Sequence, residues 1–230
     1  MEVEDTISVM RTEKKYLLSY QKKNILENRL SGIMKRDEYG RMGRYFVRSL
    51  YFDSIYDDDL FDKINGLEYR KKIRLRIYHP EQKWVKLELK QKRGAVQNKK
   101  TIKISREDAE QMMEGRYDFL LKMQGPLPIA LYQIMEQGVY RPKCLIEYHR
   151  AAFVEDTNNT RITIDSETGV TGRYENFFSD RISLQPLLKY PTLEVKYNGF
   201  LLDYIKEMLE IADFTEVSLS KYEMSRLEMI

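Results

Sequence analysis

Cationic and aliphatic side chains alternate over residues 70–78, and this is the clearest pattern in the chain. The cations at alternate positions are Arg70, Lys72, Arg74 and Arg76. The aliphatic side chains between them are Ile73, Leu75 and Ile77. Because successive side chains of a strand point to opposite faces, the pattern predicts a half-buried strand with a dense cationic face. Like charges along one face repel one another, so this face is expected to meet anions.

A second stretch, residues 84–90, shows the same alternation. Lys86, Glu88 and Lys90 share one face, and three aliphatic side chains share the other. A turn at residues 79–81, which contains Pro80, separates the two stretches. They are therefore predicted to form an antiparallel hairpin with its charges on one face.

The remaining periodicity predicts strands and helices in an irregular order. Further strands are expected at residues 7–16, 45–53, 99–104, 144–150, 161–165, 192–197 and 217–222. Helices are expected at residues 20–35, 55–64 and 105–114, twice within 118–137, and at 201–211 and 224–230. Because this order is not a regular alternation of strand and helix, it predicts one α+β domain over residues 1–230, built on an antiparallel sheet.

Two antiparallel architectures would accommodate strands that are charged on one face. A sandwich would bury the aliphatic faces and leave the charges in solvent. A closed barrel wrapped by helices would instead turn the charges inward and create a basic lumen. Since Arg and Lys recur on nearly every strand with few acids beside them, a fully solvated charged face is the less favoured interpretation, and the choice between the two architectures stays open here.

Composition narrows the classes of function. Charged residues make up 33% of the 230 residues, yet the formal net charge is only +3, which argues against general attraction to nucleic acid. One cysteine, Cys144, and two histidines exclude a disulfide framework and an ordinary zinc site. A bound metal would be held by carboxylates, which suits Mg²⁺ or Mn²⁺. The absence of a long apolar stretch or a signal peptide predicts a cytoplasmic protein.

A series of short motifs runs in order from about residue 11 to residue 226. Their defining positions are Arg11, Glu13, Lys15 and Tyr16; residues 49–53; Arg70 to Tyr78; Glu88 and Lys90; Tyr148, Arg150 and Phe153; Arg161 and Asp165; Glu194 and Lys196; and Ser220, Lys221 and Tyr222. Together they resemble the VTC domain, the polyphosphate polymerase domain of the vacuolar transporter chaperone complex and its bacterial relatives. The resemblance implies the triphosphate tunnel fold of the CYTH-like superfamily, an eight-stranded antiparallel barrel with a basic lumen.

The resemblance also implies roles for individual residues. Those expected to act in catalysis by holding phosphates are Arg74, Arg76, Lys90, Arg150 and Lys221. Further phosphate contacts are expected from Lys15 and Tyr148, and from three cations on the charged strand faces, Lys103, Arg161 and Lys196. Glu194 is expected to bind the metal, helped by Glu13 or Glu88. Many tunnel enzymes begin their first motif with a glutamate where this chain has Arg11, so metal binding would depend mainly on Glu194.

The activity that the resemblance implies is transfer of the terminal phosphate of ATP onto a polyphosphate chain, with Mn²⁺ or Mg²⁺. Such a transfer needs alignment and charge neutralisation, and a terminal phosphate is already largely ionised, so no strong base is required. Two alternatives stay open: hydrolysis of tripolyphosphate or a nucleoside triphosphate, and a non-catalytic polyphosphate-binding module. No specific nucleic-acid partner and no membrane insertion is expected. A membrane-protein partner and the oligomeric state stay open.

Some of these residues have structural alternatives. Glu194 could form an ion pair with Lys196, and Tyr148 could belong to the core. Trp84 is expected to pack under a helix rather than to cap a tunnel mouth. The acidic run at residues 57–59 is expected to be a solvated helix start rather than a metal site.

Overall fold

The structure is a computed structural model that describes residues 11–40, 43–94, 96–210 and 216–229. Its contacts group into two compact units. The first unit falls within Met1–Tyr45, His149–Glu167 and Lys189–Leu219, and the second within Phe46–Tyr148, Thr168–Leu188 and Ser220–Ile230. The chain passes between the units inside strands β7 (Arg141–Glu155) and β8 (Thr160–Thr171).

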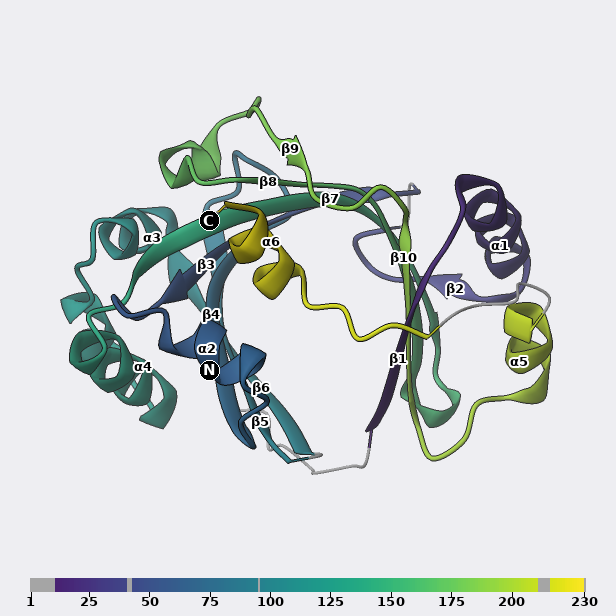
Figure 1. Ribbon diagram of the computed structural model, residues 1–230, viewed down its shortest axis with the longest axis horizontal. Helices are drawn as coiled ribbons and strands as arrows, with labels where there is room; N and C mark the ends of the chain where they lie inside the picture. Colours follow the sequence, from purple (N-terminus) through teal and green to yellow (C-terminus); the bar gives the residue numbers. More distant parts are fainter. Residues whose placement is uncertain (1–10, 41–42, 95, 211–215, 230) are drawn as a thin grey trace. The chain divides into compact units, whose positions relative to one another are not determined.

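The first unit packs two helices on the apolar face of its strands. Its other elements are β1 (Arg11–Leu17), α1 (Tyr20–Ile33), β2 (Lys35–Arg36), η2 (Thr157–Asn159), β10 (Thr192–Asn198) and α5 (Asp203–Glu210). As the sequence predicts, α1 begins after Ser19, whose hydroxyl accepts a hydrogen bond from the Lys22 amide at 3.2 Å. Leu26 and Leu30 of α1 and Ile205 of α5 meet Ile162, Ile164, Leu193 and Val195 of the strands in one buried cluster. The two helices lie side by side (Figure 1).

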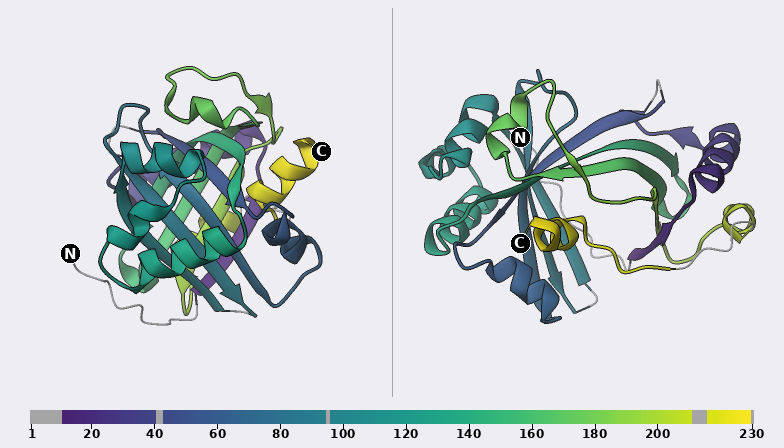
Figure 2. Two further views of the ribbon diagram at one scale, coloured as in Figure 1. Left: turned by 90° about the vertical axis from the view of Figure 1, so that its left-hand side faces the viewer. Right: turned by 45° about the horizontal axis from the view of Figure 1, so that its top comes forward.

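The second unit is larger and carries helices on both faces of its strands. Its other elements are β3 (Tyr45–Asp53, which starts in the first unit), α2 (Asp58–Ile64), β4 (Tyr69–Ile77), β5 (Trp84–Arg93), β6 (Val96–Ser105), α3 (Arg106–Met113), η1 (Asp118–Lys122), α4 (Pro126–Gln137), η3 (Tyr174–Phe178), β9 (Gln185–Pro186) and α6 (Lys221–Met229). Figure 2 shows α3 and α4 against one face of β4–β6, with α6 on the other side. Ile73, Leu75 and Ile77 are buried beneath α3 and α4, so the predicted aliphatic face is the core face.

The expectation of a closed, eight-stranded barrel is wrong. The sheet has ten strands, and its hydrogen-bonded order runs β1-β10-β8-β7-β3-β4-β5-β6, with β2 pairing to β7 and β9 to β8. Over the described residues this order ends at β6 without returning to β1, so the sheet is antiparallel but open. The two additional strands are two-residue pairings that hydrophobic periodicity cannot predict.

The segment at residues 217–222 accounts for part of the difference between the predicted barrel and the observed sheet. It was expected to be a last strand, but Val217 makes only one backbone hydrogen bond to Lys15, beside an isolated bridge between Tyr16 and Glu216. Helix α6 then begins at Lys221, which places this lysine at a helix start rather than on a strand. The first predicted strand begins in residues 1–10, outside the described residues.

The acidic run before α2 also differs from its prediction as a solvated helix start. Asp57 forms a two-bond ion pair with Arg226 at 2.7 and 3.0 Å, and its Oδ1 lies 2.8 Å from the Lys143 ammonium. Asp59 is 1% exposed and faces Lys71 at 2.9 Å. The run therefore anchors α6 and the strands around it. No helix among the described residues is long and apolar enough to cross a membrane.

Candidate functional site

Arg74 and Glu88 form the centre of a charged face in the second unit. The two residues are cross-strand partners on β4 and β5, and Arg74 Nε donates to Glu88 Oε2 at 2.6 Å. Arg74 Nη1 also donates to the Tyr51 hydroxyl on β3 at 2.8 Å. Burial opposes ionisation of Glu88, but Arg74, Arg76 and Lys99 outweigh it and hold the pKa of this carboxyl well below its usual range. The Glu88 carboxylate and the Tyr51 hydroxyl thus orient the Arg74 guanidinium.

Arg76 is bound differently. It is 7% exposed, Nε donates to Ser49 Oγ at 3.1 Å, and Nη2 donates to the Tyr148 hydroxyl at 3.2 Å. Among the described residues no carboxylate forms an ion pair with it. Across the sheet Arg76 pairs with Ser49 on β3 and with Lys86 on β5, and Lys86 pairs in turn with Lys103 on β6. A buried guanidinium held by neutral hydroxyls keeps its charge available to an anion.

Lysines extend the charged face across β5 and β6. By register, Lys90 lies between Lys72 and Lys99, and Lys86 lies between Arg76 and Lys103. Lys99 Nζ reaches Glu88 Oε1 at 3.3 Å, although the Lys99 side chain is 54% exposed. Lys86 Nζ lies 5.1 Å from the centre of the Tyr78 ring. The structure therefore brings Lys90 and Lys103 onto the same face as Arg74 and Arg76.

Helix α6 brings Lys221 to this face. Lys221 Nζ lies 4.9 Å from the centre of the Tyr148 ring, whose hydroxyl accepts from Arg76. The helix is held by Tyr222, which stacks on Tyr51 with ring centres 5.2 Å apart and donates to the buried Asp53 carboxylate. Just before the helix, Ser220 Oγ accepts from Lys72 Nζ at 2.7 Å. The second-unit face, as we call it below, comprises Ser49, Tyr51, Lys72, Arg74, Arg76, Lys86, Glu88, Lys90, Lys99, Lys103, Tyr148 and Lys221.

The first unit carries a smaller cluster in which acids and bases alternate. On β1 and β10, Lys15 pairs with Glu194 and Glu13 pairs with Lys196. Lys15 Nζ lies 3.0 Å from Glu13 and 3.6 Å from Glu194, and Lys196 Nζ lies 2.5 Å from Glu194 and 3.7 Å from Glu13. We call these four residues the first-unit cluster. In this cluster Glu194 forms the ion pair with Lys196 that was predicted as an alternative to metal binding.

The ionisation of this cluster follows from burial and from the pairs. Burial would raise the pKa of Glu194, but Lys196 and Lys15 hold it well below its usual range. Burial is the largest influence on Lys196 and lowers its pKa despite Glu194 and Glu13. For Lys15 the two glutamates outweigh burial and raise the pKa. Glu194 is therefore an ionised carboxylate paired with two ammonium groups.

The two first-unit arginines that were predicted to contact phosphate, Arg150 and Arg161, are paired with acids. Arg150 binds Asp165 through two hydrogen bonds of 2.7 and 2.9 Å. Arg161 Nη2 donates to Asp37 Oδ2 at 2.7 Å and lies 3.3 Å from the Tyr45 hydroxyl. Arg150 and Arg161 thus have carboxylate partners, unlike Arg76.

A divalent cation fits the donor set of the first-unit cluster. No group of three or more Asp, Glu, His or Cys side chains within the described ranges could hold a metal. Glu13 and Glu194, however, share two ammonium groups, so a cation already bridges the two carboxylates. Mg²⁺ and Mn²⁺ are commonly bound by one or two carboxylates together with phosphate oxygens and water. Glu88, also predicted as a ligand, lies in the second unit and faces Arg74 and Lys99.

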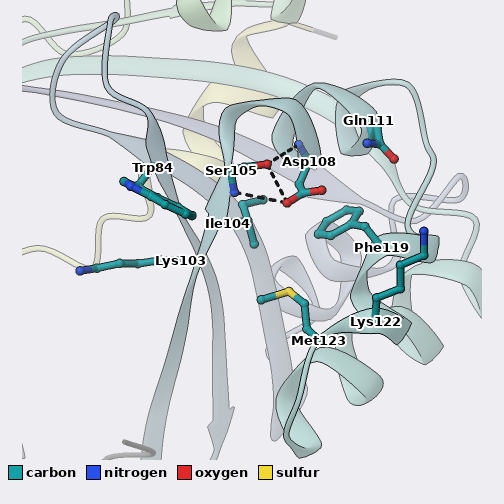
Figure 3. A pocket seen from close by; sticks show the side chains of 9 residues that line it. All are labelled: Trp84, Lys103, Ile104, Ser105, Asp108, Gln111, Phe119, Lys122 and Met123. Carbon is teal, nitrogen blue, oxygen red and sulfur yellow. Dashed lines mark hydrogen bonds between the residues drawn. The ribbon is translucent and has the colours of Figure 1, made fainter. Parts of the chain in front are cut away.

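A pocket of about 330 Å³ lies on the second unit at the end of β6, next to α3 and η1. Figure 3 shows Phe119 and Met123 on one side of the strand, and Trp84 and Lys103 directed away from them on the other. Trp84 is 62% exposed, so the expectation that it packs under a helix is wrong. Strand alternation places Trp84 on the same face of β5 as Lys86. Ser105, the cross-strand partner of Trp84, lies just before the start of α3.

Several residues of these sites were given no role in the site from the sequence, although residues 49–53 and Tyr222 belong to the motifs of the resemblance. Ser49, Tyr51 and Asp53 alternate along β3, so period two places them on one face of that strand, and the pairing of β3 with β4 then sets Ser49 opposite Arg76 and Tyr51 opposite Arg74. Tyr222 could not be found in this way because it lies on a helix that was expected to be a strand. Asp37 and Tyr45 lie far from Arg161 in sequence, and no local pattern connects them.

Comparison with solved structures places the fold. A putative adenylate cyclase from Bacillus halodurans matches with a TM-score of 0.55 and 15% identity, over 93% of this chain and 94% of that one. A putative adenylyl cyclase from Hippeastrum, described as having a dominant triphosphatase activity, matches with a TM-score of 0.58 and 13% identity, over 95% and 96%. The chain therefore shares its fold with these two proteins. Curated protein sequences yield no match.

The family itself follows from the sequence. The model of the VTC domain matches residues 10–230, which is nearly the whole chain. This range contains every motif on which the resemblance was based, from Arg11 to Tyr222. The chain therefore belongs to the VTC domain family.

Proposed function

We propose that the protein is a metal-dependent phosphotransferase that moves the terminal phosphate of ATP onto a polyphosphate chain. The observation that carries the proposal is Arg76, a buried guanidinium whose described hydrogen-bond partners are the hydroxyls of Ser49 and Tyr148. A buried cation without a carboxylate is unfavourable unless an anion approaches it, and Arg matches phosphate through two parallel hydrogen bonds. Membership of the VTC domain family supports phosphate as that anion.

The other cations of the second-unit face would hold further phosphates of the same substrates. Arg74 is oriented by Glu88 and Tyr51, and Lys221 shares Tyr148 with Arg76. Lys90 and Lys103 extend the face along β5 and β6. In the first unit, we propose further phosphate contacts from Lys15, Arg150, Arg161 and Lys196.

Glu194 and Glu13 would hold Mn²⁺ or Mg²⁺ in this proposal, with the partly exposed side chains of Lys15 and Lys196 turned toward water or phosphate. When bound, the cation supplies neutralising charge to phosphate oxygens. The nucleophile would be a terminal phosphate oxygen, which is already largely ionised at neutral pH. The chain's own contribution is alignment and charge neutralisation, which suits phosphoryl transfer.

Hydrolysis of a triphosphate is the second candidate function. It is favoured by the dominant triphosphatase activity described for the Hippeastrum protein, whose fold is similar. The same cations would bind the triphosphate, with water in place of the chain end as acceptor.

The test is incubation of the full chain with ATP and Mn²⁺, with and without a short polyphosphate primer, and sizing of the products on a gel. The variant is Arg76→Ala, and the control is Lys100→Ala, which removes an exposed cation of β6 whose strand partner is Leu89 on the core face. We expect lengthening chains from the wild type and Lys100→Ala, and a rate about 100-fold lower for Arg76→Ala. Free phosphate without longer chains would favour the hydrolase. Tight polyphosphate binding without turnover would favour a binding module, and no binding at all would exclude the proposal.

A further inference from the structure

Thr163 of β8 carries a buried hydroxyl that no neighbour satisfies. The residue is 3% exposed, and its Oγ1 has no hydrogen-bond partner among the described residues. Buried hydroxyls in folded proteins are nearly always bonded to protein, to water or to an ion. This unsatisfied hydroxyl therefore indicates a missing neighbour at this position.

The register of the sheet places Thr163 beside the first-unit cluster. Thr163 is the cross-strand partner of Glu194, and such partners have their Cβ atoms about 5 Å apart. Its neighbours Ile162 and Ile164 lie in the core, so Thr163 points to the opposite, charged face. On β10, Glu194 is in turn flanked by Leu193 and Val195 of the same core. The hydroxyl and the carboxylate thus lie next to each other on one face.

Two carboxylates leave a divalent cation short of protein oxygens. Glu13 and Glu194 are the carboxylates of the first-unit cluster, and both already share the ammonium groups of Lys15 and Lys196. Mg²⁺ and Mn²⁺ prefer oxygen ligands, and a hydroxyl can offer a lone pair to the ion while it donates its proton to a neighbouring acceptor. A threonine hydroxyl beside Glu194 is such a ligand.

We propose that Thr163 supplies the third protein oxygen of a divalent-cation site with Glu13 and Glu194, directly or through one water bound to the ion. The inference rests on the proposed function, because it takes the first-unit cluster to be the metal site. It adds to the two carboxylates of the proposed metal site a third ligand, Thr163, whose side chain is uncharged. It also gives the unsatisfied hydroxyl a partner that is absent from the protein itself.

The chain offers a matched control on the same strand. Ser166 is 1% exposed, and its Oγ also lacks a partner among the described residues. Three positions beyond Thr163, it lies on the opposite face of β8 by alternation. If an unsatisfied hydroxyl alone were enough to affect metal binding, Ser166 and Thr163 would behave alike.

The experiment is a titration of the full chain with Mn²⁺ alone, followed by calorimetry and by the electron paramagnetic resonance of the ion. We expect Thr163→Val to weaken Mn²⁺ binding about 10-fold, Thr163→Ser to bind nearly as the wild type, and Ser166→Ala to be unchanged. Glu194→Gln should lose most of the binding. In the absence of metal, Thr163→Val should unfold at the same temperature as the wild type or higher, because valine has the same shape without an unsatisfied hydroxyl.

The outcomes separate the inference from the proposed function. Loss of binding in Glu194→Gln with wild-type binding in Thr163→Val would overturn the role of Thr163 and leave the metal site in place. Unchanged binding in Glu194→Gln would overturn the metal site itself. A measurement without any variant is electron–nuclear double resonance of Mn²⁺ in protein labelled with ¹³C-threonine. A short-range coupling is expected, and its absence would overturn the inference even if Thr163→Val failed to fold.

Discussion

The charged surfaces of the two units use the same residue types in different proportions. In the first-unit cluster two lysines face two glutamates, and each ammonium reaches both carboxylates. On the second-unit face Glu88 faces Arg74 and Lys99, while Arg76 has neutral partners. The charges of the first arrangement balance, whereas the second holds an excess of positive charge. In the proposed function, the balanced cluster is the cation site and the surface with excess cations is the phosphate site.

The largest effect that separates the two units is expected from Glu88→Gln. Glu88 is 1% exposed, and its loss would leave Arg74 without its acid. Breaking a buried ion pair by removing one partner destabilises by about 3–5 kcal/mol, so we expect a loss of about 3 kcal/mol. Glu194→Gln should lose only about 1 kcal/mol, because the side chains of Lys15 and Lys196 are 27% and 25% exposed and can turn to water. Urea unfolding, followed by circular dichroism and by the fluorescence of Trp84, measures both.

The control for this comparison is Glu81→Gln in the exposed turn between β4 and β5, which should stay within about 0.5 kcal/mol of the wild type. Inorganic tripolyphosphate should raise the melting temperature of Glu88→Gln more than that of the wild type, since the anion would replace the lost carboxylate beside Arg74. Equal losses for Glu88→Gln and Glu194→Gln would remove the difference between the two units.

A smaller effect is expected in the pH dependence of stability. In the second unit, burial raises the pKa of Asp59 to about 7, partly offset by Lys71. In the first unit, the resolved carboxyl shifts of Glu27, Glu155, Glu194 and Asp203 are all downward. A carboxyl whose pKa is higher in the folded state stabilises below its unfolded value of about 3.9 and loses that contribution as pH rises to about 7.

We therefore expect the free energy of unfolding to fall by about 2 kcal/mol between pH 5 and pH 7 through Asp59. Asp59→Asn should flatten this slope, although the variant also loses the ion pair with Lys71 and is less stable overall. Thermal melts at several pH values measure how the free energy of unfolding changes with pH, independently of the lower overall stability of the variant. An equally steep slope in Asp59→Asn would assign the pH dependence to other groups.

How much the sequence predicted depends on whether a contact is local. The hairpin of β4 and β5 and the starts of the helices near residues 20 and 105 follow from patterns within a few residues, and the structure confirms them. Period two also predicted that Arg74 and Arg76 share a face with Lys90 and Glu88. For these features the chemistry of neighbouring positions was sufficient.

The features that were missed depend on contacts between distant segments. Strand-like alternation at residues 217–222 was overridden by Tyr222, which docks α6 on Tyr51 and Asp53. The acidic residues Asp57 and Asp59 are held by Arg226, Lys143 and Lys71, which come from three other elements. Closure of the sheet likewise depends on which edges meet, and periodicity along one strand carries no such information.

The smallest effect compares the helix caps of the two units. In the second unit, Ser105 Oγ accepts from the Asp108 amide at 3.0 Å, and the Ser105 amide donates back to Asp108 at 3.3 Å. In the first unit, the exposed Ser19 accepts from Lys22 without a reciprocal acid. The cap at Ser105 satisfies two backbone amides, whereas the cap at Ser19 satisfies only one. The free energy of unfolding should therefore fall by about 1–1.5 kcal/mol in Ser105→Ala and by about 0.5 kcal/mol in Ser19→Ala. Urea unfolding distinguishes these values, and a larger loss for Ser19→Ala would show that the reciprocal bond to Asp108 does not strengthen the cap at Ser105.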